Sequence, residues 1–187
     1  MILLASQSPR RRELLAQIGV QHEVMPVHVD ERWIAGEAAD AYVHRVTLAK
    51  AEKARRLRPE LPVLAADTAV VLDGRPLGKP RDRAHGVAML LALSGRSHRV
   101  LSGVALATGD GTHYRLSSSE VTFAPLTEEQ ASRYWNSGEP ADKAGGYAVQ
   151  GRAALFIRRI AGSYSGIMGL PLYETGELLA EAGLLDV

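Results

Sequence analysis

The sequence of 187 residues contains no cysteine, which excludes disulfide bonds, thiolate nucleophiles and cysteine metal sites. Aromatic residues make up only 5% of the chain, and no apolar run is as long as a transmembrane helix. The first apolar run, residues 2–5, is too short for the core of a signal peptide. We therefore expect a cytoplasmic protein without a membrane partner.

An excess of charge of one sign is missing as well. The net charge is only +1, so the chain has no global field for nucleic acid, and any basic site must be local. We expect no stable nucleic-acid partner. Hydrophobic residues make up 46% of the chain and charged residues 23%, as in ordinary folded proteins. The length suits one domain, residues 1–187.

Helical and strand patterns alternate along the chain, which favours an α/β fold with a mixed, twisted sheet and flanking helices. Helices are expected from residue 9 to Gly19 and from Thr127 to about Gly138, and over residues 37–58, 83–93 and 172–182. Strands are expected over residues 2–5, 62–72, 98–107, 114–123 and 154–160, with extended chain over residues 20–28.

The first strand turns into the first helix at an unusual elbow. Ser8 suits the N-cap and Pro9 the first helical position, but Arg10–Arg12 then place three cations where the helix dipole is already positive. Such a helix start, with free N–H groups, hydroxyls and arginines, is typical of a site for an anion such as phosphate. The alternative is a solvated basic turn.

Asp67 interrupts an otherwise apolar strand pattern together with Thr68. An isolated carboxylate in a buried strand is costly to ionise unless a metal, a cation or several donors meet it. Asp67 is therefore either a buried residue satisfied by backbone amides, or a metal ligand or general base at a strand end, where α/β folds place their sites.

Two lysines are ambiguous on local pattern. Lys79 lies between Gly78 and Pro80, on a restricted backbone that would fix a point charge for a phosphate, although a surface loop is the simpler interpretation. Lys50 falls inside the long helix predicted over residues 37–58, where an exposed lysine is the simpler interpretation.

Residues 138–151 form a glycine-rich segment with paired charges. Its glycines would permit close approach of the backbone to a ligand. Tyr147 offers an aromatic face and Gln150 an amide able to pair with the edge of a base. The alternative is a turn that only packs against the core.

Familiar catalytic and metal motifs are absent. The sequence has no GxSxG, GxGxxG or kinase signature. Its histidines lack zinc-ligand spacing. The available carboxylates are Asp67 and the Asp30-Glu31 pair, whose hard oxygens suit Mg²⁺ or Mn²⁺ shared with substrate phosphates.

Several motifs follow one another in order along the chain. They are Leu4-Ala5-Ser6-Gln7-Ser8-Pro9-Arg10-Arg11, Ala66-Asp67-Thr68, Gly78-Lys79-Pro80, Leu93-Ser94-Gly95 with His98, residues 138–151, and Gly169-Leu170-Pro171-Leu172. Together these motifs resemble the Maf family of nucleoside triphosphate pyrophosphatases. The resemblance implies a fold like that of inosine triphosphate pyrophosphatases, with two lobes around a central cleft. It also implies metal-dependent hydrolysis of a nucleoside triphosphate to the monophosphate and pyrophosphate.

Within the family, residues 142–147 and Gln150 resemble the branch that acts on dTTP and UTP. The Cys-Ala-Gly-Ser-Phe pattern of the 7-methyl-GTP branch is absent. Carried over by position, the resemblance makes Asp67 the proton acceptor and, with Glu31, a ligand of a divalent cation. It assigns the phosphates to Ser6, Arg10, Arg11, Lys50 and Lys79, and base choice to Arg11, Thr68 and Gln150.

Two other functions remain open on the sequence. One is a house-cleaning pyrophosphatase for modified pyrimidine nucleotides. The other is a nucleotide-binding regulator without catalysis, since a fold does not fix a function. The sequence does not give the oligomeric state, and a homodimer is compatible with it.

Overall fold

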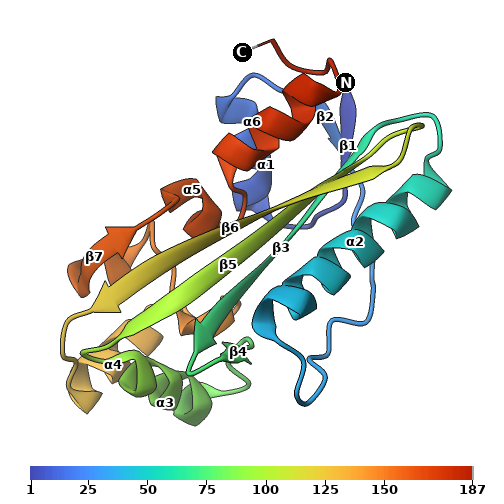
Figure 1. Cartoon of the computed structure of the whole chain (residues 1–187). Coiled ribbons are helices and arrows are strands. Elements are labelled where there is room, and N and C mark those ends of the chain that lie inside the picture. The colour runs from blue at the N-terminus through green and yellow to red at the C-terminus, as the bar shows by residue number, and fades with distance from the viewer. Residues whose placement is uncertain (187) are drawn as a thin grey trace.

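In the computed structural model, which describes residues 1–186, a seven-stranded mixed sheet is flanked by helices (Figure 1). The strand order is β2-β1-β3-β5-β6-β7, and β4 also pairs with β3. Strands β1 and β2 are parallel to each other and to β3, whereas the remaining pairs are antiparallel. This confirms the predicted α/β fold. The strands are β1 (Ile2–Leu4), β2 (His22–Val24), β3 (Val63–Leu72), β4 (Arg75–Leu77), β5 (Ser97–Ala107), β6 (Thr112–Phe123) and β7 (Ile157–Ala161).

One edge of β3 is paired only at its two ends. At the start of β3, Val63 and Leu64 lie opposite β1. At its end, Val70 and the next two residues pair with β4 across the turn at Asp73-Gly74. In the described part of the chain, no strand pairs with residues 65–69 on this edge, while β5 pairs with the other edge throughout. Asp67 and Thr68 lie in this bare stretch, in the middle of β3, so the expectation that Asp67 stands at a strand end is wrong.

The two faces of the sheet carry different helices. The helices are α1 (Pro9–Gln17), α2 (Ala39–Leu57), α3 (Arg83–Leu93), α4 (Glu128–Trp135), α5 (Tyr164–Met168) and α6 (Leu172–Glu181), with 3₁₀ turns at Ala144–Gly146 and Arg152–Leu155. Helix α2 packs its alanines and valines against the face that holds Ala65 and Ala69 (Figure 1). Because strand side chains alternate, Asp67 shares this face with α2, whereas Thr68 belongs to the opposite face.

The opposite face carries two separate apolar clusters. The first contains Leu64 and Ala66 of β3 and residues of α1 and α6. The second contains Val70 and Leu72 of β3 and residues of α3 and α4. Thr68 lies between them along β3, and β5 likewise gives Val100 to one cluster and Val104 to the other, so these two strands join the two lobes that the resemblance implies. None of the helices within residues 1–186 has the length and apolar character needed to cross a membrane.

Most boundaries follow the sequence patterns, with instructive exceptions. Gly19 follows the end of α1 with a φ of 72°, as predicted for a helix stop. The strand expected from residue 154 begins at Ile157, because residues 152–155 form a 3₁₀ turn. Ser8 is the N-cap residue of α1, but its side chain makes no capping bond; instead its N–H donates to Ser6 Oγ. The capping prediction for the Ser8 hydroxyl is therefore wrong.

Candidate functional site

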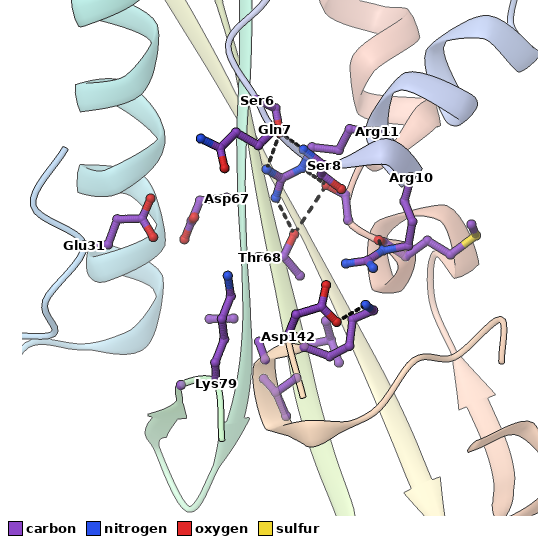
Figure 2. A pocket seen from close by; sticks show the side chains of 18 of the residues that line it. Ser6, Gln7, Ser8, Arg10, Arg11, Glu31, Asp67, Thr68, Lys79 and Asp142 are labelled. Carbon is purple, nitrogen blue, oxygen red and sulfur yellow. Dashed lines mark hydrogen bonds and ion pairs between the residues drawn. The ribbon is translucent and has the colours of Figure 1, made fainter. Parts of the chain in front are cut away.

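A cleft of about 860 Å³ opens at the bare edge of β3 (Figure 2). The β1–α1 elbow, the chain before α2, the loop after β4, residues 142–150 and the end of α5 all contribute to its walls. The structure brings together in this cleft every site residue that the sequence predicted, namely Ser6, Arg10, Arg11, Glu31, Lys50, Asp67, Thr68, Lys79 and Gln150.

Arg11 is braced on three sides. Its Nε donates to the carbonyl of Gly169 at 2.6 Å, one terminal nitrogen to Ser6 Oγ at 3.1 Å and the other to Thr68 Oγ1 at 3.4 Å. Burial lowers the pKa of Arg11 from its ordinary value. Arg11 thus ties the elbow to β3 and to the turn after α5.

Arg10 is held more loosely. Its Nε donates to the carbonyl of Met168 at 3.0 Å, and the guanidinium points into the space beside Asp142 (Figure 2). Because this bond uses only Nε, the terminal nitrogens of Arg10 are available to an anion in the cleft. Arg12 is exposed on the outside of the helix and does not line the cleft. The three arginines of the elbow therefore differ in role: Arg11 braces the structure, Arg10 keeps donors for an anion, and Arg12 lies on the surface.

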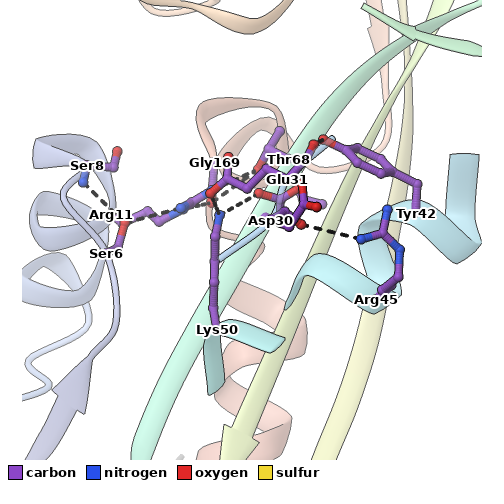
Figure 3. A network of polar contacts seen from close by, with 12 residues as sticks. Ser6, Ser8, Arg11, Asp30, Glu31, Tyr42, Arg45, Lys50, Thr68 and Gly169 are labelled. Atoms are coloured by element: carbon purple, nitrogen blue, oxygen red, sulfur yellow. Dashed lines mark hydrogen bonds and ion pairs between the residues drawn. The ribbon is translucent and has the colours of Figure 1, made fainter. Parts of the chain in front are cut away.

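Lys50 joins the two carboxylates of the site. Its Nζ lies 2.8 Å from Glu31 Oε1 (Figure 3) and 2.8 Å from Asp67 Oδ1. Lys50 and Asp67 are both buried, at 8% exposure each, whereas the Glu31 side chain is half exposed. The interpretation of Lys50 as an exposed helix lysine is wrong. Asp67 is met by a cation rather than by backbone amides, so the first interpretation of this residue is wrong. Its role as a metal ligand or general base stays a prediction.

The same geometry tests whether a divalent cation fits. The described residues hold no cluster of three or more acidic, histidine or cysteine ligands. Two carboxylates nevertheless converge on one cation, the ammonium of Lys50. Magnesium is bound in proteins by one or two carboxylates plus substrate phosphates and water. The donor set of Glu31 and Asp67 therefore fits Mg²⁺ or Mn²⁺ that arrives with a phosphate ligand.

Lys79 approaches from the opposite wall. It is exposed on the loop after β4 and lines the cleft, with its ammonium pointing toward Asp67 (Figure 2). The N–H of Gly145 donates to the carbonyl of Gly78 at 3.1 Å, which fixes this loop to the segment at residues 138–151. Lys79 is therefore a cation on an anchored loop.

Buried aromatic residues pin the segment at residues 138–151. Tyr134 donates to Glu139 Oε1 at 2.5 Å and accepts from the N–H of Ala148 at 3.1 Å. Tyr147 Oη lies 2.7 Å from His98 Nε2. With Tyr147 only 5% exposed, its ring mostly serves the core, and Gln150 is left exposed in the cleft wall.

Two of the four glycines of this segment have a different role from the one predicted. A Cβ on Gly145 would lie 2.8 Å from Val70 Cγ1, and a Cβ on Gly151 would overlap the Glu139 carboxylate. The space beside these two glycines is thus taken by the protein's own side chains, so the expected close approach of a ligand is wrong for Gly145 and Gly151, whereas Gly138 is open. Gly145 also has a φ of 69°, in the left-handed region.

Sequence reasoning missed two residues of α2 next to the site, Tyr42 and Arg45. Both donate to backbone carbonyls in the chain that carries Glu31. No sequence motif marks such residues, because a backbone acceptor is the same at every position. Their only sequence signal is their place on a helix that also carries Lys50.

Comparison with known proteins gives consistent matches over nearly the full length. The Maf-like protein family matches residues 1–182. A dTTP/UTP pyrophosphatase of Alkalilimnicola ehrlichii is 54% identical over 186 residues, covering 96% of this chain and 92% of the relative. A dTTP/UTP pyrophosphatase of Cupriavidus pinatubonensis is 52% identical, covering 98% and 97%. A third protein of the same name, from Methylococcus capsulatus, is 52% identical, covering 98% and 91%.

Proposed function

Since the chain belongs to the Maf family, we propose that it hydrolyses dTTP and UTP to the monophosphate and pyrophosphate, with residues 1–187 as one catalytic unit. Membership of the family confirms the resemblance found in the sequence. The names of the curated relatives support the substrate assignment. The observation that carries the proposal is the convergence of Asp67 with Lys50, Lys79 and Arg10 in one cleft.

The cationic groups suit a triphosphate. Arg10 and Lys79 present nitrogens from different walls of the cleft (Figure 2), and Lys50 adds an ammonium beside Asp67 of β3. Charge that develops on the pyrophosphate leaving group is stabilised by preorganised donors of this kind. Arg11 lies in the same region and donates hydrogen bonds to Ser6 and Thr68. Its role therefore combines contact with the substrate and support of the elbow.

Asp67 is placed to accept a proton from water. Lys50 engages Oδ1, which leaves Oδ2 as an acceptor facing the cleft. In the proposed reaction the water oxygen bonds to the α-phosphorus, the bond from that phosphorus to the bridging oxygen breaks, and the water proton passes to Asp67. The electron pair of the broken bond leaves on pyrophosphate.

Glu31 and Asp67 would hold the divalent cation, Mg²⁺ or Mn²⁺. When bound, such an ion neutralises phosphate charge and polarises the phosphoryl oxygens. Lys50 neutralises the same two carboxylates in the structure. A phosphate oxygen offers the Lys50 ammonium an alternative partner. Lys50 would therefore neutralise the two carboxylates without nucleotide and bind a phosphate when nucleotide is present.

In this proposal the base of the nucleotide is recognised by the wall of the cleft that holds Gln150, together with Thr68 and Arg11, which line the same cleft. Uracil and thymine share an imide edge with one N–H donor flanked by carbonyl acceptors, and a glutamine amide matches it with one acceptor and one donor. Gln150 is exposed at the cleft, so its amide is available for this pairing.

Release of pyrophosphate from a panel of nucleoside triphosphates, with Mg²⁺ or Mn²⁺, tests the proposal. We expect UTP and dTTP to be the preferred ordinary substrates. No release with either metal would favour a non-catalytic nucleotide-binding regulator. Higher kcat/KM for modified than for ordinary pyrimidine triphosphates would favour a house-cleaning role. The cytoplasmic location and a homodimer remain predictions.

A further inference from the structure

Glu31 lies in a part of the chain without regular secondary structure. Between β2 and α2, residues 25–38 form no helix or strand, and the Glu31 side chain is half exposed. A metal-ligating residue on such a stretch is ordered only if other groups fix its backbone, because each free residue retains about 1–2 kcal/mol of conformational entropy. The site therefore needs a device that holds Glu31 in place.

Two side chains of α2 supply that device. Three successive carbonyls around Glu31 each accept a hydrogen bond from the helix, and Figure 3 shows the bond between Arg45 and Asp30. The carbonyl of Asp30 accepts from Arg45 at 3.4 Å, that of Glu31 from Tyr42 at 2.9 Å, and that of Arg32 from Arg45 at 3.0 Å. The backbone on both sides of Glu31 is thus anchored by hydrogen bonds to one rigid element, helix α2.

Arg45 also holds the far end of the same loop. Its Nε and one terminal nitrogen donate to the Glu37 carboxylate at 2.7 and 2.8 Å, and this pairing lowers the pKa of Glu37. Trp33 in turn donates to the carbonyl of Glu37 at 2.9 Å. One guanidinium therefore closes residues 30–37 into a loop, while its plane lies over the ring of Tyr42 with 5.7 Å to the centroid.

We propose that Arg45 is a positioning residue which, with Tyr42, holds Glu31 at the cleft and thereby sets the affinity of the site for its divalent cation. The inference rests on the proposed function, in which Glu31 and Asp67 share that cation. Helix α2 also carries Lys50, which binds the Glu31 carboxylate. Backbone and side chain of Glu31 are thus both fixed by α2.

The chemistry at Arg45 requires arginine. Its five N–H donors in a planar fork serve the carboxylate of Glu37 and two carbonyls at once. Lysine would keep the charge, but its single nitrogen cannot reach both ends of the loop. Arg45→Lys therefore separates the loss of the fork from the loss of charge.

The test is a binding measurement that does not require turnover. Electron paramagnetic resonance follows Mn²⁺ binding to the protein saturated with a UTP analogue whose α,β-bridging oxygen is replaced by methylene. We expect Arg45→Met and Arg45→Lys to weaken Mn²⁺ binding roughly 10- to 100-fold, the usual loss when a group supporting a metal ligand is removed. Tyr42→Phe should weaken it less. Arg56→Met, at an exposed position on the same helix, is the matched control and should bind as wild type does.

Turnover gives a second readout. Half-saturation of pyrophosphate release by Mn²⁺ should rise in Arg45→Met by the same factor, with kcat recovered at excess metal, since the reacting groups remain intact. Trypsin should also cut after Arg32 faster in this variant than in Arg56→Met, because the loop is released.

Wild-type Mn²⁺ affinity and wild-type cleavage rates in both Arg45 variants would overturn the proposal. So would a Glu31→Gln variant with unchanged Mn²⁺ affinity, because Arg45 would then have no ligand to position. Absence of pyrophosphate release from wild type, together with weakened Mn²⁺ binding in Arg45→Met, would contradict the proposed function and still support the role of Arg45.

Discussion

The imidazole of His98 and the phenol of Tyr147 share a buried hydrogen bond, with 2.7 Å between Nε2 and Oη. This bond joins the central strand β5 to the segment that carries Gln150. His98 is 3% exposed, and it also packs edge-on against Phe123 with ring centroids 5.1 Å apart. The wall of the cleft that holds Gln150 is therefore anchored by a buried polar pair inside an aromatic cluster.

This pair makes stability depend on acid pH. Burial lowers the pKa of His98 from 6.5 to about 4. Between these values the unfolded chain binds a proton that the folded protein does not, so the free energy of unfolding falls as the pH falls from about 6.5 to about 4. The loss attributable to His98 is on the order of 3 kcal/mol.

Urea denaturation at several pH values checks this expectation. His98→Gln places an amide where Nε2 lies and cannot titrate, so it should flatten the acid slope of stability relative to wild type. An acid slope that is the same in both proteins would contradict the assignment to His98.

Asp67→Asn should reduce turnover by about 10²- to 10⁴-fold, the usual contribution of a general base. The amide keeps the shape of the side chain and loses the proton acceptor. Pyrophosphate release at saturating UTP measures kcat, and calorimetric titration with the methylene analogue measures binding. Near-normal turnover with an unchanged metal requirement would show that another group activates water.

Lys50→Met should increase the affinity of the nucleotide-free protein for Mn²⁺. In wild type the ammonium neutralises Glu31 and Asp67, so a free metal ion has to displace it. Without the lysine the two carboxylates face each other with no cation, and we expect about tenfold tighter binding, equivalent to 1.4 kcal/mol. Lys79→Met removes a cation that touches neither carboxylate and serves as the control. Equal Mn²⁺ affinity in the Lys50 variant and wild type would exclude this competition.

Gln150→Ala should lower kcat/KM for UTP and dTTP by about 10-fold, since one or two hydrogen bonds to the base are worth about 1–2 kcal/mol together. The value for CTP should change less, because its edge carries a different donor pattern. The ratio of kcat/KM values for UTP and CTP measures the effect. A ratio equal to that of wild type would place base recognition elsewhere in the cleft.

Gly145→Ala should destabilise the protein more than Gly138→Ala. Both glycines have positive φ values, 69° and 78°, and this alone costs alanine about 1 kcal/mol. At Gly145 the new Cβ would also meet Val70, whereas no atom lies within 4 Å of a Cβ at Gly138. Chemical denaturation of the two variants gives the difference. Equal losses would show that Val70 moves aside freely.

The order and type of the main elements could be predicted because their signals are local. The apolar run of β3, the hairpin turn between β5 and β6 and the capping box of Thr127 and Gln130 each depend on neighbouring residues. Strand β4 was not predicted, because Pro76 within three residues argues against a strand. An edge position beside β3 tolerates that proline.

The members of the site could be predicted from the family pattern, but their arrangement could not. Local pattern alone gave Lys50 as an exposed helix residue, since nothing in the helix sequence shows that Asp67 lies across from it. The brace at Arg11 depends on the carbonyl of Gly169, which is distant in sequence and carries no side-chain signal. Contacts to backbone acceptors remain invisible until the chain is folded.

The bare stretch of β3, which forms the bottom of the cleft, is held by neighbouring strands at both of its ends and along its far edge. Strands β1 and β4 hold its ends, and β5 holds its full length on the far edge. The walls, by contrast, are loops with their own separate anchors. Substitutions in the walls can therefore alter which nucleotide fits, while Asp67, the proposed proton acceptor, stays where the pairing of β3 holds it.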